Sequence, residues 1–137
     1  MPRAPRSTAR VRLFAAIGIA ASLGIGLGLQ LLDRNAWIDA AGGILYVALV
    51  GLLVLLVAPR LPAWAVAAIA LGVAVAVELL QLTGIPAAIV AAVPPARLVF
   101  GSSFDPWDLV AYVAGAAILW AVVAVAGFAA RQREASV

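Results

Sequence analysis

The segment from residue 36 to residue 57 reads AWIDAAGGILYVALVGLLVLLV. Asp39 is its only charged residue and lies near its start. A helix of this length is about 33 Å long at about 1.5 Å per residue, which is enough to cross a hydrocarbon core of about 30 Å. The segment therefore predicts a transmembrane helix.

Three other segments have the length of roughly 20 predominantly apolar residues that a membrane span needs, and they cover 13–32, 64–82 and 109–128. The breaks between spans contain charged, proline and other polar residues, and they cover 33–35, 59–62 and 83–108. We therefore predict an all-α integral membrane protein, a four-transmembrane-helix bundle. It would form a single transmembrane domain over residues 1–137, with cytoplasmic tails at 1–12 and 129–137.

The composition supports a membrane protein and excludes several chemistries. Hydrophobic residues make up 66% of the chain and charged residues 11%, with a mean hydropathy of +1.17, whereas a soluble domain has about 25% charged residues. Cysteine and histidine are absent, and every basic residue is arginine. Disulfides, thiol nucleophiles, Cys/His zinc sites, Ser-His dyads and lysine Schiff bases are thereby excluded. We expect no metal site and no cofactor.

The arginines predict the orientation in the membrane. The sequence pI of about 10.6 would also suit a nucleic-acid-binding protein, but the arginines lie at segment ends, so we expect no nucleic-acid partner. One side of the predicted topology holds seven of them: Arg3, Arg6, Arg10, Arg12, Arg60, Arg131 and Arg133. The other side holds Arg34 and Arg97. The positive-inside rule then places both termini in the cytoplasm, in a multi-pass protein of the inner (plasma) membrane. Tryptophans of the expected aromatic belts stand at span ends: Trp37, Trp64 and Trp107.

The first apolar segment has an arginine-rich lead, which is also typical of a signal peptide. Its Ala20-Ala21-Ser22 sequence resembles a cleavage region. The apolar run continues to Leu32, however, which is longer than a typical signal core. We therefore expect this segment to be retained as a membrane anchor.

Small residues recur at four-residue spacing along the predicted spans, as expected where membrane helices pack closely. The repeats are Gly18 with Ser22 and Gly26, Gly24 with Gly28, Ala68 with Gly72 and Ala76, and Ala111 with Gly115. These faces predict tight packing within the bundle, or contact with a partner helix or a second copy of the chain. In a chain so rich in alanine and glycine, chance also produces such spacing.

Glu78 is the clearest candidate for a functional side chain, because an ionisable group within a span costs about 2.5–3.5 kcal/mol on insertion scales. It lies in the outer third of the third span, and Gln81, three residues later, shares its helical face. Asp39 and Tyr46 lie at the same depth on the second span, and Asp108 and Tyr112 on the fourth.

The third connection adds Arg97, Ser102, Ser103 and Asp105 on the same side. We therefore predict a polar pocket near the outer leaflet, with the following binding candidates: Tyr46, Glu78, Gln81, Arg97, Asp108 and Tyr112. Arg97 is the expected counter-charge for one of the carboxylates.

Structural roles compete with binding for these residues. Asp105-Pro106-Trp107-Asp108 has the form of a helix start, with Asp105 as the N-cap and Asp108 three residues after it. Glu78 could extend to water or pair with Arg97 only for folding. The two tyrosines suit an aromatic belt, and Asp33-Arg34-Asn35 suits a solvated turn.

The segment 85–95 is apolar but too short to cross a membrane, and prolines bound it. It suits a re-entrant or an interfacial segment. Two interpretations are open: a lid over the pocket, or a loop that lies flat on the lipid.

Several of these elements resemble a known family. They are Gly42-Gly43-Ile44-Leu45-Tyr46, Glu78-Leu79-Leu80-Gln81, Arg97, Phe100-Gly101 through Phe104, and Asp108-Leu109-Val110-Ala111-Tyr112 with Gly115. The sequence resembles a family of small bacterial four-helix membrane proteins of unknown function, which is itself similar to the VanZ-like family. The resemblance implies the fold and the polar set, but no reaction. Gly43 stands where that family usually has an acidic residue, and Asp39 lies one turn earlier.

Three functions fit these observations. The first is a non-enzymatic cell-envelope protein that binds a membrane lipid headgroup, a lipid-linked precursor or a membrane partner. The second is a membrane enzyme acting on a phosphate- or glycan-bearing lipid through Glu78, Arg97 and Asp108. The third is a small transport subunit with Glu78 as a proton or cation site.

Overall fold

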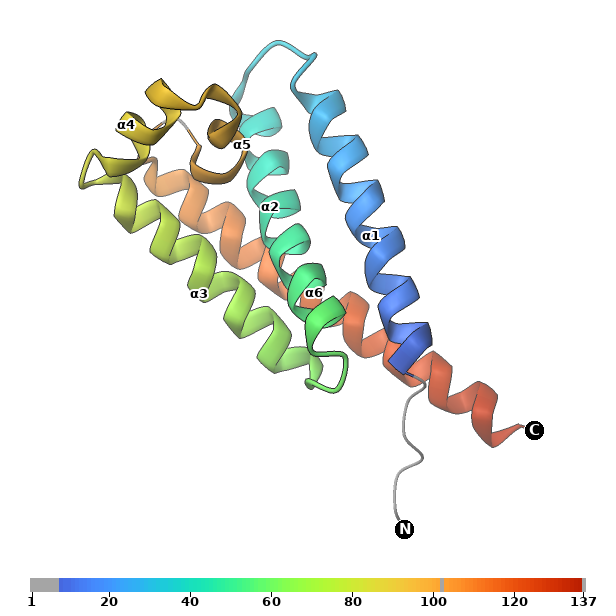
Figure 1. Ribbon diagram of the computed structural model, residues 1–137. Coiled ribbons are helices and arrows are strands. Elements are labelled where there is room, and N and C mark those ends of the chain that lie inside the picture. The colour runs from blue at the N-terminus through green and yellow to red at the C-terminus, as the bar shows by residue number, and fades with distance from the viewer. Residues whose placement is uncertain (1–7, 102, 137) are drawn as a thin grey trace.

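The computed structural model describes residues 8–101 and 103–136, and all of the regular structure in these ranges is helical (Figure 1). The elements are α1 (Thr8–Leu29), α2 (Ala36–Val57), α3 (Ala63–Gln81), α4 (Ile85–Ala92), the 3-10 helix η1 (Pro94–Ala96), α5 (Arg97–Phe100) and α6 (Pro106–Ala135).

Four of these helices are long and apolar enough to cross a membrane: α1, α2, α3, and α6 over Pro106–Ala130. The predicted all-α, four-transmembrane-helix fold is confirmed. The second span has the predicted bounds, whereas α1 starts at Thr8 rather than residue 13 and α6 continues to Ala135. The predicted tails are therefore partly helical, because arginine is a good helix former and does not end a helix as proline does.

Two of the spans begin at a side-chain cap. The Asp105 carboxylate accepts a hydrogen bond from the Trp107 backbone N–H at 2.9 Å, and Pro106 occupies the first turn of α6. Asn35 caps α2 in the same way, through the backbone N–H groups of Trp37 and Ile38. The predicted cap at Asp105 is confirmed, and the predicted solvated turn at 33–35 has the additional role of starting α2.

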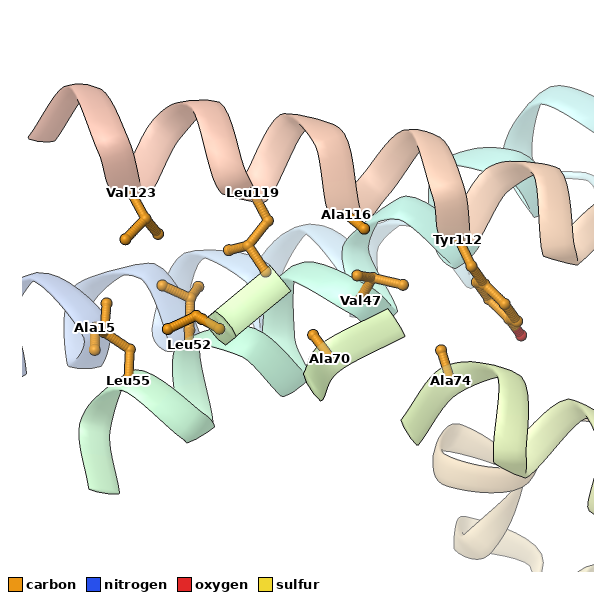
Figure 2. Close-up of a cluster of buried hydrophobic side chains, with 11 residues drawn as sticks. Ala15, Val47, Leu52, Leu55, Ala70, Ala74, Tyr112, Ala116, Leu119 and Val123 are labelled. Atoms are coloured by element: carbon orange, nitrogen blue, oxygen red, sulfur yellow. The ribbon is translucent and has the colours of Figure 1, made fainter. Parts of the chain in front are cut away.

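α2 is the central helix of the bundle. It packs against α1, α3 and α6, and α3 also packs against α6, whereas α1 contacts only α2 among the described helices. The buried hydrophobic cluster joins these helices (Figure 2), and it consists of Ala15, Val47, Leu52, Leu55, Val66, Ala70, Ala74, Tyr112, Ala116, Leu119 and Val123. Many other large apolar side chains are exposed on the outside of the bundle, as lipid contact requires.

One predicted small-residue face packs closely where α6 meets α2. A Cβ atom on Gly115 would lie 3.0 Å from the Ile44 Cα atom and 3.1 Å from its carbonyl oxygen. Gly115 therefore lets the two backbones approach each other. By contrast, nothing lies within 4 Å of a Cβ at Gly24, Gly28 or Gly72, so the predicted tight packing is wrong at these positions within the described chain.

The connection between α3 and α6 folds over one end of the bundle. α4, η1 and α5 contact one another, and α4 and α5 contact α3. Figure 1 places this segment where α1 and α3 end and where α2 and α6 begin. We call this the α5 end of the bundle. The short apolar helix predicted over 85–95 is present as α4, in which Pro86 is the buried residue.

Candidate functional site

Glu78 joins α3 to the start of α6. Its side chain is completely buried. One carboxylate oxygen, Oε1, accepts a hydrogen bond from the Asp105 backbone N–H at 2.7 Å, and the other, Oε2, accepts one from the Tyr112 hydroxyl at 3.0 Å. Both oxygens thus have a partner. Asp105 lies immediately before α6, and Tyr112 lies within it.

This arrangement changes the expected role of Asp108. In a capping box, the side chain three residues after the N-cap accepts a hydrogen bond from the backbone N–H of the cap residue. Here Glu78, from a different helix, takes that N–H of Asp105. The Asp108 carboxylate has no hydrogen-bond partner among the described residues, although its position in the first turn of α6 is favourable for a negative charge.

Gln81 ties α5 to α3. Its Nε2 donates a hydrogen bond to the Phe100 carbonyl oxygen, while its buried Oε1 has no partner among the described residues. Gly101, which follows, has a positive φ of 69°, and a Cβ there would lie 2.9 Å from Gln81 Nε2. Glycine therefore allows the backbone to turn after α5 with a positive φ and to pass close to the Gln81 side chain.

A cavity of about 390 Å³ lies at the α5 end. Its lining has one wall from α1 and α2 and another from α5 and the following loop, and α3 and α6 contribute Val77, Gln81, Asp108 and Tyr112. Charged and polar groups on it include Arg34, Asp39, Arg97, Asp105 and Asp108. Apolar groups on it include Leu23, Leu27, Ile38, Leu45, Leu49, Leu98 and Val99. The cavity is therefore amphiphilic.

The predicted ion pair of Arg97 with Glu78 or Asp108 is absent from the described residues, so this expectation is wrong. Arg97 is exposed at the start of α5 and lines the cavity. The hydrogen bonds from Asp105 and Tyr112 hold Glu78 instead. The ion pair at the cavity joins Arg34 and Asp39, whose side chains are 57% and 40% exposed and thus of small energetic value.

Comparison with known proteins places the chain in a family. The model of a family described as "Protein of unknown function (DUF2809)" matches residues 32–116, which is more than half of the chain. The chain belongs to the DUF2809 family. No curated protein and no solved structure matches it.

The matched segment of this DUF2809 protein contains all six predicted binding candidates. The structure brings five of them to the cavity lining: Tyr46, Gln81, Arg97, Asp108 and Tyr112. Glu78 does not line it, because Tyr112 and the Asp105 backbone cover its carboxylate. α1 lies outside the matched segment, yet Ser22 and Gly26 on it also line the cavity.

One feature of the DUF2809 site was not predicted from the sequence, and one interpretation of the sequence is wrong. The wall from α1 was missed because its lining residues are small or apolar, and such residues carry no sequence signal of a site. The lid interpretation of 85–95 is wrong, since α5, Gly101, Ser103 and Asp105 border the cavity and α4 does not. Ser102, the side chains of Arg131 and Arg133, and residues 1–7, which include Arg3 and Arg6, lie outside the described part of the chain.

Proposed function

We propose that this DUF2809 protein is a multi-pass protein of the bacterial inner membrane that binds the headgroup of a membrane lipid or lipid-linked precursor in the cavity at the α5 end. The observation that carries the proposal is the amphiphilic lining of that cavity. Its polar groups come from the two connections and the helix ends, and its apolar groups come largely from α1, α2 and α5.

The size and position of the cavity suit a lipid. Its volume of about 390 Å³ lies within the range of about 300–1,000 Å³ that is typical of ligand pockets. α1 contacts α2 alone, so one cavity wall belongs to a helix with most of its surface outside the bundle core. An acyl chain can lie along that apolar wall while the headgroup meets the polar residues.

The environment of Glu78 favours binding over acid-base catalysis. A general acid or base must reach a proton of the substrate. Glu78 is fully buried, both of its oxygens are hydrogen-bonded, and it is separate from the cavity lining. Ala74 and Ala70, one and two helical turns before Glu78 on α3, belong to the buried hydrophobic cluster, which also disfavours an ion path through Glu78.

The family that this sequence resembles is itself similar to the VanZ-like family, which supports a role in the cell envelope. The sequence resembles the former family in the order Glu78-x-x-Gln81, Arg97, then Asp108-Leu-x-x-Tyr112. In this protein, Glu78 and Gln81 hold the α5 end together, and Arg97 and Asp108 face the ligand. With the orientation proposed below, the bound lipid would be one available at the outer leaflet.

Filling the cavity should displace the lipid. Gly26 lines the cavity and has open space around its Cβ position. In a Gly26→Phe variant, we expect bound lipid to fall about tenfold, because the phenyl ring occupies the volume that the lipid uses. Native mass spectrometry of protein extracted in mild detergent measures the bound lipid.

Gly24→Phe is the matched control. Gly24 is on the same helix and also has open space at its Cβ position, but it is not among the described residues that line the cavity. Equal lipid content in both variants would contradict a lipid site in the cavity.

We also propose that both termini are cytoplasmic, which places the α5 end at the outer leaflet. The basis is the excess of arginine on one side of the four spans. Alkaline phosphatase fused after residue 137 should be inactive, and the same enzyme inserted beside Arg97 should be active. A phosphatase that is active only at residue 137 would refute this orientation.

A further inference from the structure

The charges around the cavity differ in whether they have a partner. Arg34 and Asp39 form an ion pair with each other. The Asp105 carboxylate caps α6, and Glu78 lies beneath the lining with both oxygens occupied. These groups already have roles within the fold.

Two charged groups on the lining have none. Arg97 and Asp108 form no hydrogen bond or ion pair within residues 8–101 and 103–136, and they do not pair with each other. One is a cation at the start of α5, and the other is an anion in the first turn of α6. Beside apolar walls, both charges gain from an oppositely charged ligand group more than they would in water.

We infer that the ligand is a zwitterionic, amine-bearing phospholipid, whose phosphate meets Arg97 and whose ammonium group meets Asp108. This inference rests on the proposed lipid site. Arginine binds phosphate through several N–H donors in a planar fork. An ammonium group supplies N–H donors that a carboxylate accepts.

The overall charge of the lining disfavours an anionic headgroup. The lining carries Arg34 and Arg97 against Asp39, Asp105 and Asp108, and the carboxylate of Glu78 lies just below. A second negative group on the ligand would therefore be repelled. A purely cationic ligand would leave Arg97 without a partner.

The aromatic rings beside Asp108 are also compatible with an ammonium group. Tyr112 lies one helical turn after Asp108, and its ring centroid is 6.1 Å from that of Tyr46 at an interplanar angle of 45°. Both rings belong to residues of the cavity lining. Aromatic faces attract ammonium ions within about 6 Å.

A competition experiment tests the selectivity. The purified full-length protein in detergent receives phosphatidylethanolamine and phosphatidylglycerol with the same acyl chains, and native mass spectrometry measures both adducts. We expect phosphatidylethanolamine to bind about tenfold better. Asp108→Asn should remove this preference without weakening phosphatidylglycerol, whereas Arg97→Gln should weaken both lipids about tenfold, because both carry a phosphate.

Three possible results would contradict parts of the proposal. Glycerophosphoethanolamine, which has the headgroup but no acyl chains, should not displace the lipid, and effective displacement would overturn the assignment to a lipid. Phosphatidylglycerol could bind the unmodified protein as well as phosphatidylethanolamine or better, and Gly26→Phe could still block it. That result would overturn the preference for a zwitterionic lipid but would keep the proposed lipid site. Lipid binding that Gly26→Phe does not reduce would overturn the proposed function itself.

Discussion

Replacing Glu78 with leucine is expected to lower the free energy of unfolding by about 2–4 kcal/mol. Leucine fills a similar space but accepts no hydrogen bond. The buried Tyr112 hydroxyl and the partly buried Asp105 N–H would each lose their acceptor. Because these two groups lie at the start of α6, the contact of α6 with α3 should weaken first. Thermal unfolding in detergent measures the loss as a lower midpoint.

Glu78→Gln is the matched control, and we expect it to unfold close to the midpoint of the unmodified protein. Its amide oxygen can accept the Asp105 N–H, and its NH₂ group can donate to the Tyr112 oxygen after the hydroxyl rotates. If Glu78→Gln were as unstable as Glu78→Leu, the negative charge itself would hold the structure. A stable and fully functional Glu78→Gln variant would argue against an acid-base or ion-binding role for this residue.

Gly115→Ala is expected to destabilise the bundle by about 1–3 kcal/mol. The added methyl group would lie 3.0 Å from the Ile44 Cα atom and 3.1 Å from its carbonyl oxygen. Both are backbone atoms, which cannot rotate away as a side-chain end can, so α6 and α2 must separate. The same unfolding measurement in detergent reports the change.

Gly72→Ala separates this packing effect from the general effect of alanine in a helix. Gly72 lies in α3 and has open space around its Cβ position. Alanine there should leave stability unchanged or raise it by about 0.5–1 kcal/mol, because it favours helix more than glycine does. Equal destabilisation by both substitutions would contradict the close approach of α6 and α2 at Gly115.

The small-residue repeats show where sequence reasoning loses precision. Ala111 with Gly115 and Gly24 with Gly28 have the same spacing, yet Gly115 lies against α2 and Gly24 and Gly28 have open space. Spacing defines the face of a helix that carries small residues. It does not define whether another helix packs on that face.

The depth of each polar residue along its predicted span indicated much of the candidate site. Tyr46, Gln81, Arg97, Asp108 and Tyr112 do line one cavity, because residues at helix ends and in one connection share a side of any antiparallel bundle. Hydrogen-bond partners were not predictable in this way. The carboxylate of Glu78 is bound to Tyr112 and to the backbone of Asp105, residues that are 34 and 27 positions away.

The sequence by itself determined that the chain is an all-helical membrane protein with four spans, since length and hydropathy are local properties and lipid requires each span to satisfy its own backbone. It also determined the start of α6 at Asp105. Only the tertiary structure decided that Glu78 supports the fold beneath the cavity while Arg97 and Asp108, on its lining, have no partner in the described part of the chain. These roles depend on how α3, α5 and α6 are rotated and spaced, and many weak packing contacts between distant segments set that arrangement together.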